Sequence, residues 1–434
     1  MPQRVRSASM ESESPPRVAD PNRSIVDSIE WSSVVPSLQM LSACRLAFSP
    51  SRLVLGLLAV VLVYVLGTAM DAAWGPADAD TAGGGGYLIF ETLVQREVSA
   101  FKHTIGSALR LEIGVPVLLQ PGSWEGSGVL GGLTAMVFGI PLWLVTTHPG
   151  FAAVFTLVAL LVTVTLGGAI SRSMAMQVGR HRRIGAGESI GYVTRRMVWY
   201  LATALIPPGV VVVLALLASV VGLLFNVPLL DVVGGLLYGL VLILSIGAAV
   251  VVIGMAAAGN LMMPALAVEG TDAFDAVSRA FAYVYGRPLH FLWYTAVVLV
   301  AGALTYAFLG LAVWLTLWLA RTSAGLWVFR GDEAQWYDAV VPPPQGGQIM
   351  VPIAWDEMSE SSRLTATLIR QWQMLMLAIL PAYAFCYYFC AYTWVYLLIR
   401  RSADGAPISE VYEGEGSASQ DVGDAVPEPS AERG

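Results

Sequence analysis

The residues best suited to chemistry in this chain are too scattered to form a recognisable active site. Its four histidines lie in four different stretches: His103, His148, His181 and His290. No H-E-x-x-H metal pair, phosphate-binding P-loop or G-x-S-x-G nucleophile turn occurs, and the three cysteines include no C-x-x-C pair. We therefore predict no catalytic residues, no metal ligands and no cofactor, and a protein that is not an enzyme.

One polar pattern occurs twice. Residues 188–195 (E-S-I-G-Y-V-T-R) align with residues 272–279 (D-A-F-D-A-V-S-R), with an acidic residue first and Val, then Thr or Ser, then Arg last. Each segment follows one long apolar run and leads into another, which is typical of a parallel repeat of span, surface helix and span. Chance similarity over so short a stretch is the alternative.

The second copy predicts a helix that lies along the inner membrane surface. Asp272 is placed to cap its N-terminus, Asp275 and Arg279 are spaced to form an i,i+4 ion pair, and Gly286 precedes a proline that ends it. The predicted contacts with anionic lipid headgroups or partner proteins are Arg195, Arg196, Glu269, Asp272, Asp275, Arg279, Arg287 and His290. The alternative is that these residues only set the topology and cap helices.

Prolines interrupt several of the apolar runs. The candidate helix breaks are Pro141, Pro207, Pro208, Pro264 and Pro381. Backbone carbonyls freed at such breaks can line a substrate cavity inside a membrane protein, but plain kinks are the alternative. The predicted span interiors hold no charged residue and no histidine, which argues against an ion-driven carrier.

The elements that must position these residues are membrane-spanning helices. Hydrophobic residues make up 56% of the chain and charged residues only 13%, about half the share in ordinary globular domains. Long uncharged runs, of the kind that crosses a bilayer, predict six spans, at residues 53–70, 151–170, 199–225, 230–257, 291–319 and 372–399. We therefore predict an all-α, polytopic transmembrane helical bundle that binds no nucleic acid.

Arginine placement predicts the orientation of the bundle. Six arginines precede or abut the first span and six lie between residues 171 and 198, while others flank later spans. The positive-inside rule then places both termini in the cytoplasm and the protein in the inner membrane. If Arg52 and Arg172 both lie in the cytoplasm, the chain between them crosses the membrane an even number of times. Two of the predicted spans lie in that interval, so the apolar run 129–145 is predicted to be a re-entrant or interfacial helix and not a seventh span.

The same pattern gives the domain organisation. We expect a disordered cytoplasmic arm at residues 1–40, a transmembrane domain at 41–401 and a disordered acidic tail at 402–434. The predicted extracytoplasmic loops are 71–128 and 321–370, and the cytoplasmic loops are 171–198 and 258–290.

An amphipathic helix is predicted outside, at residues 87–113. Its apolar residues recur every three or four positions: Phe90, Val94, Val98, Phe101, Ile105 and Leu109. We expect this face to lie on the outer leaflet or to cap the bundle, although it could equally cover apolar loops of this same protein.

Several stretches resemble one known family. The runs 261–279 (L-M-M-P-A-L-A-V-E-G-T-D-A-F-D-A-V-S-R) and 283–288 (Y-V-Y-G-R-P), with 167–172 and 396–412, resemble a family of uncharacterised bacterial multi-spanning inner-membrane proteins. More distantly, P-x-x-x-V-E-G followed by A-x-x-R is similar to the membrane domain associated with glycerophosphodiester phosphodiesterases. The resemblance implies fold and location but no activity, and no segment is long enough to supply a phosphodiesterase barrel.

Two functions follow as expectations. The first is a non-enzymatic membrane scaffold that contacts membrane lipids and partner membrane proteins through its surface helices. The alternative is a transporter or lipid translocator that uses the proline-broken helices. A lipid-modifying enzyme ranks third, and it would require Glu269, Asp272 and His290 to converge in one deep pocket.

Overall fold

The computed structural model describes residues 36–76, 87–116, 126–328, 333–341 and 359–413. The described residues are almost entirely helical, with one isolated antiparallel bridge between Val115 and Ser127. The chain is therefore an all-α protein, as the sequence predicts. Residues 1–35 of the expected N-terminal arm and residues 414–434 of the expected acidic tail lie outside the described residues.

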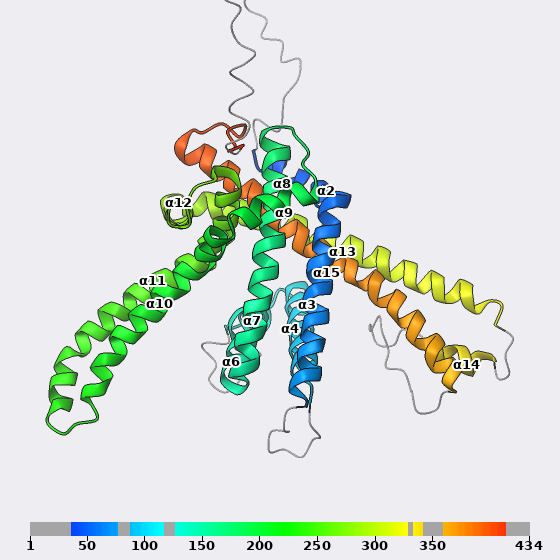
Figure 1. Cartoon of the computed structure of the whole chain (residues 1–434), viewed down its shortest axis with the longest axis horizontal. Helices are drawn as coiled ribbons and strands as arrows, with labels where there is room; N and C mark the ends of the chain where they lie inside the picture. The colour runs from blue at the N-terminus through cyan, green and yellow to red at the C-terminus, as the bar shows by residue number, and fades with distance from the viewer. Residues whose placement is uncertain (1–35, 77–86, 117–125, 329–332, 342–358, 414–434) are drawn as a thin grey trace, which may run out of the picture.

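Three groups of long helices fan out from one compact end, which we call the head (Figure 1). The first leg contains α3 (Pro50–Trp74), α4 (Ile89–Leu109), α5 (Gly128–Thr134), α6 (Ile140–Thr147) and α7 (Pro149–Val162). The second leg pairs α10 (Met197–Leu224) with α11 (Leu230–Glu269). The third pairs α13 (Pro288–Gly325) with α15 (Glu360–Asp404), and the short α14 (Glu333–Val340) packs against α15.

The head collects the short helices and the inner ends of the long ones. It holds η1 (Pro36–Leu41), α2 (Ser42–Ala47), α8 (Gly168–Gly179), α9 (Ala186–Arg195) and α12 (Ala273–Gly286). The last turns of α11 and α15 end there, and residues 405–413 pack among them. Most of the large hydrophobic core lies where these elements meet.

Seven helical stretches are long and apolar enough to cross a membrane, and they include all six predicted spans. The seventh is residues 128–147, in which a π-helical turn, η3 (Ala135–Gly139), joins α5 to α6. A second π turn, η4 (Thr163–Gly167), joins α7 to α8. The chain is therefore a multi-pass membrane protein by length and apolar composition.

The seventh stretch is one arm of a helical hairpin whose other arm is α4. At the start of α4, the carboxylate of Asp71 at the end of α3 accepts bonds from the Phe90 and Glu91 amides at 2.7 and 3.1 Å. At the end of α6, His148 bonds the Tyr87 hydroxyl at 2.9 Å. Both ends of the hairpin thus lie at the far end of α3, away from the head. Residues 128–147 are themselves one of the membrane-length stretches, so the expectation that they form a re-entrant or interfacial helix stays a prediction.

The two arms approach each other through small side chains. A Cβ added at Gly132 of α5 would lie 2.1 Å from the Thr104 hydroxyl oxygen and 3.1 Å from the Ala100 carbonyl oxygen of α4. The glycine therefore sets the helix separation, as small residues do in membrane helix pairs.

The apolar stripe predicted on α4 faces mostly away from the protein. Phe90 is buried, but Val94, Val98 and Ile105 are exposed, and Leu109 is 81% exposed. The stripe is therefore free to contact lipid, while a different face, with Leu93 and Ala100, is buried within the leg.

The second predicted outer loop packs on the third leg where it is described. Tyr337 of α14 donates to the Arg321 carbonyl at 2.7 Å, and the Trp336 indole donates to Ser362 at 2.9 Å. Arg321 also pairs with Asp338 and donates to the Val341 carbonyl. The far end of α13 is thereby tied to that of α15.

The crossing of α3 and α15 has no room for a side chain at Gly56. An added Cβ would lie 2.5 Å from the Cys386 sulfur and 2.6 Å from the Ala382 carbonyl oxygen. The same contact lets the Cys386 thiol donate to the Arg52 carbonyl at 2.9 Å. A larger residue would push the two helices apart.

We expect Gly56→Ala to lower the free energy of unfolding in detergent by about 2 kcal/mol, because the new methyl group overpacks this crossing. Thermal unfolding followed by tryptophan fluorescence measures the change. Gly239→Ala in α11 is the matched control, since nothing lies within 4 Å of a Cβ there, and its stability should stay constant or rise slightly. Equal stability of the two variants would contradict the packing described.

Candidate functional site

The polar core of the head forms around one carboxylate, that of Glu269. This residue ends α11, and its side chain is 10% exposed. One oxygen lies 2.8 Å from Arg400 Nε and 2.9 Å from the Tyr396 hydroxyl, and the other lies 3.6 Å from Arg279 Nη1. A carboxylate at a helix C-terminus is unfavourable by itself. The two guanidinium groups offset that cost and tie α11 to α12 and α15.

A short segment after α15 closes the head. Gly405 has φ +70°, a left-handed conformation that ends α15 and turns the chain back. The Tyr412 amide then donates to the Val268 carbonyl at 2.9 Å, and Arg400 Nη1 donates to the Glu410 carbonyl at 2.7 Å. We call residues 405–413 the clasp. Sequence reasoning had placed them in a disordered tail, but their backbone and the buried Val411 are packed against helices.

The clasp also reaches α8. Arg180 donates to the Val411 carbonyl and pairs with Glu413 at 3.0 Å. A Cβ added at Gly179 would lie 2.3 Å from a Val411 methyl carbon, so the glycine makes room for that side chain. Four helices, α8, α11, α12 and α15, are thus joined by the clasp and the Glu269 cluster.

The predicted cap of α12 is present. The Asp272 carboxylate accepts a bond from the Asp275 amide at 2.8 Å. Arg279 pairs with Asp275 at 2.9 Å, and this hydrogen bond raises the pKa of the guanidinium, with Glu269 adding to the effect. On the same helix, Tyr283 donates to Asp404 of α15, and burial is the main cause of its raised pKa.

The other predicted contact residues divide into two groups. Arg196 lies in the head, where it donates to the Gly270 carbonyl. Arg195, the preceding residue, is exposed. Arg287 and His290 lie at the junction of α12 and α13. His290 is exposed, and its ring centre is 6.4 Å from that of Tyr294. Of the three residues that a lipid-modifying enzyme would require, Glu269 is paired with arginines, Asp272 caps α12, and His290 is exposed on α13.

The two aligned segments occupy similar places but differ in detail. Each forms a short helix between two long ones, α9 before α10 and α12 before α13. Asp272 caps α12, whereas the N-cap of α9 is Gly185, and Glu188 pairs instead with Arg182 at 3.0 Å. The aligned acidic residues therefore do not share one role.

Sequence reasoning did not select Arg172, the most buried cation of this part of the head apart from Arg52. It lies in α8 at 3% exposure, with its guanidinium carbon 4.1 Å from the ring centre of Tyr192. The available signal was an arginine between Ile170 and Met174, inside a helix that remains apolar on both sides.

The predicted proline breaks do not break the helices. Pro207 and Pro208 lie within α10, Pro264 within α11 and Pro381 within α15, while Pro141 occupies the first turn of α6. Each of these three long helices continues past its proline, and of the two alternatives only a plain kink is compatible with that.

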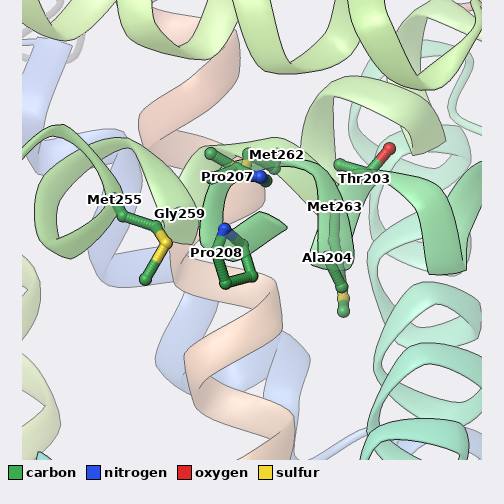
Figure 2. Close-up of a pocket in the computed structure, with 8 residues that line it drawn as sticks. All are labelled: Thr203, Ala204, Pro207, Pro208, Met255, Gly259, Met262 and Met263. Carbon is green, nitrogen blue, oxygen red and sulfur yellow. The ribbon is translucent and has the colours of Figure 1, made fainter. Parts of the chain in front are cut away.

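One small cavity does form at Pro207 and Pro208, where α10 meets α11. Figure 2 shows its walls, and the cavity volume is about 180 Å³. The lining residues are Thr203, Ala204, Pro207, Pro208, Met255, Gly259, Met262 and Met263. The Thr203 hydroxyl is bonded to the Trp199 carbonyl of its own helix at 2.8 Å. The cavity therefore offers apolar side chains and no charge.

A titratable group missed by the sequence analysis lies in the hairpin. The acidic side chain of Glu97 on α4 is half-buried there. Among the described residues, no group of three or more histidine, cysteine or acidic side chains is placed to hold a metal ion.

No protein-family model, curated protein or solved structure matches the chain.

We expect Glu269→Gln to lower the free energy of unfolding by about 3 kcal/mol, because the buried Arg400 loses its closest carboxylate. Thermal unfolding in detergent measures the loss.

The matched control is Asp275→Asn, which removes a carboxylate from the same cluster at a half-exposed position. An i,i+4 pair of that kind contributes roughly 0.5 kcal/mol. If the two substitutions cost the same, Glu269 is not the centre of the head.

Proposed function

We propose that this chain is a non-enzymatic scaffold of the bacterial inner membrane. Its head lies at the cytoplasmic surface and holds three helical legs, whose apolar flanks contact lipids and partner membrane proteins. The observation that carries the proposal is the separation of the legs. They join at one end and present long apolar surfaces that no other part of the described chain covers.

The second leg carries this argument furthest. The most apolar stretch of α11 has no buried residue, and that of α10 is only 11% buried. Leu236 is 83% exposed, and Ile243 and Ile253 are 67% and 65% exposed along the same helix. An apolar surface of this length far exceeds what water-soluble monomers expose. Lipid chains or the helices of another membrane protein are the matching contacts.

The polar chemistry of the head favours a structural role over catalysis. The carboxylates of Glu269, Asp275 and Glu410 are each paired with an arginine. Asp404 accepts from Tyr283, and Asp272 is used as a helix cap. Groups engaged in this way are not free to act as a general acid or base, which must reach a substrate proton.

Charge placement supports the cytoplasmic orientation. The head contains Arg45, Arg52, Arg172, Arg180, Arg182, Arg183, Arg195, Arg196, Arg279, Arg287, Arg400 and Arg401. The far ends of the first and second legs hold acidic residues instead, such as Asp71 and Asp231. This separation follows the positive-inside rule and supports a cytoplasmic location for both ends of the transmembrane domain.

We expect single cysteines introduced into a cysteine-free variant to report this orientation. A cysteine at Thr147 should react with a membrane-impermeant maleimide in intact cells. A cysteine at Arg182 should react only after permeabilisation. Both positions are exposed, so access to the label is limited only by the membrane. Labelling of Arg182→Cys from outside intact cells would invert the proposed orientation.

The scaffold role predicts that the exposed flank of the second leg contacts other molecules in the membrane. A photo-crosslinking residue at Leu236 or Ile243 should form adducts with a defined membrane protein or with phospholipid in cells. The same residue at Leu261, which is on α11 but fully buried, should crosslink only within the chain. Adducts of equal yield at all three positions would contradict the role.

The alternative is a transporter or lipid translocator that uses the cavity at Pro207 and Pro208. The observation in its favour is the Met-lined apolar space between α10 and α11. Purified protein in vesicles separates the two functions. Translocation would be favoured by two results together. The wild type would move a labelled phospholipid across the vesicle membrane and a Pro207→Ala, Pro208→Ala variant would not, and no crosslinks would form at Leu236.

A further inference from the structure

Arg172 is buried with most of its hydrogen-bonding capacity unused. A guanidinium group carries five N–H donors. Arg172 is 3% exposed, and within the described residues it makes one hydrogen bond, which Nη1 donates to the Ala267 carbonyl at 2.8 Å. Its flat face stacks on Tyr192, with 4.1 Å between the guanidinium carbon and the ring centre. A buried cation in this state is costly unless something else binds it.

Arg52 shows what a fully bonded arginine looks like in the same head. It is 2% exposed and also lacks a carboxylate partner, yet all three of its nitrogen atoms donate. Nε bonds the Ser173 hydroxyl at 2.9 Å, Nη1 bonds the Leu46 carbonyl at 2.7 Å, and Nη2 bonds Gln177 and the Ser173 carbonyl. Neutral acceptors can therefore satisfy a buried arginine here, and Arg172 has only one of them.

A second cation lies close to the same tyrosine. The guanidinium carbon of Arg196 is 5.3 Å from the ring centre of Tyr192 and 4.9 Å from that of Tyr412 in the clasp. Arg196 donates to the Gly270 carbonyl. Within the part of the chain that the structure describes, no carboxylate pairs with Arg172 or Arg196. Two positive charges thus share one aromatic ring without a counter-ion.

Three buried hydroxyl groups close in the chain to these arginines have no hydrogen-bond partner among the described residues: those of Ser171, Tyr200 and Thr271. Ser171 precedes Arg172, Thr271 follows the glycine that Arg196 bonds, and Tyr200 lies one helical turn beyond Arg196. Tyr200 is fully buried and interacts electrostatically with both arginines. A buried hydroxyl normally has a partner, so that of Tyr200 is available to a ligand held by the two arginines.

We propose that Arg172 and Arg196 form a binding site for a phosphate group, with the unpaired Tyr200 hydroxyl as a further donor. Phosphate matches the site because its oxygens accept several bonds at once and its charge complements two guanidinium groups. Tyr192 orients the two arginines, and Tyr412 places the clasp against the ligand. Arg196 is half-buried, so the anion enters past it from the aqueous surface.

This inference goes beyond the scaffold role, because a scaffold of helices needs no small-anion site. The phosphate group can belong to an anionic phospholipid at the membrane surface or to a soluble phosphate compound. Both present the same oxygens to the arginines, and the experiment separates the two sources.

The first test is saturable stabilisation of the purified full chain by inorganic phosphate in detergent. A ligand that binds the folded state raises the unfolding temperature in a concentration-dependent way. We expect Arg196→Gln to weaken the apparent phosphate affinity on the order of tenfold or more, as loss of charge-assisted bonds does. Arg183→Gln is the matched control, since it removes an exposed arginine of the same head that is not among the predicted lipid contacts, and the affinity should not change.

Tyr200→Phe gives a second readout that a purely structural role would not produce. The substitution removes only the unpaired hydroxyl, so the phosphate-free protein should be as stable as the wild type or more stable. Its apparent phosphate affinity should nevertheless fall several-fold. This variant tests the proposal even if Arg172→Gln fails to fold.

The source of the phosphate is tested with vesicles of phosphatidylglycerol or phosphatidylcholine. Stabilisation by phosphatidylglycerol that competes with inorganic phosphate, and that is lost in Arg196→Gln, assigns the site to a lipid headgroup. Stabilisation by inorganic phosphate with no difference between the vesicles assigns it to a soluble compound. The proposal is overturned if neither anion stabilises the wild type, or if Arg183→Gln and Arg196→Gln lose affinity equally. Crosslinking from the legs is unaffected by either result.

Discussion

The head depends on a single buried carboxylate, that of Glu269, held between Arg400 and Arg279. Its position at the end of α11 makes it electrostatically unfavourable unless cations reach it from other helices. Arg400 comes from α15 and Arg279 from α12, so satisfying one charge fixes the relative placement of three helices. The first and third legs also contact each other, where α3 crosses α15 at Gly56. Their spread in Figure 1 is set by the angles at which they leave this junction.

The membrane helices could be predicted from the sequence because their signal is local. An uninterrupted apolar run of sufficient length specifies a span without knowledge of its neighbours. All six predicted spans coincide with observed helices. Whether the prolines interrupt these helices was left open, because a proline also occurs within a continuous helix, where loss of one N–H is tolerated. Pro264 is an example, since α11 runs past it to Glu269.

The head was only partly predictable because its contacts join residues far apart in the chain. The cap at Asp272 and the pair of Asp275 with Arg279 follow from spacing within one helix. By contrast, the hydrogen bond from the Tyr412 amide to the Val268 carbonyl joins a polar segment to the end of a helix. Neither the segment nor the helix end has a periodic residue pattern from which this contact could be predicted. The sequence left open which way the α4 stripe faces for a related reason. Amphipathicity shows that a helix has two faces, but in a bilayer the apolar face need not be the one that meets protein.

The clasp has a consequence for how this protein is made. Residues 405–413 emerge from the ribosome after every helix that they join, so the hydrogen bonds of Val268, Arg180 and Arg400 with them form only when translation has passed the last span. Until then, the groups at the inner ends of α8, α11 and α15 that bond the clasp lack these hydrogen-bond partners. Insertion of the helices and completion of the head are therefore separate events, and the second is a late, post-insertion step.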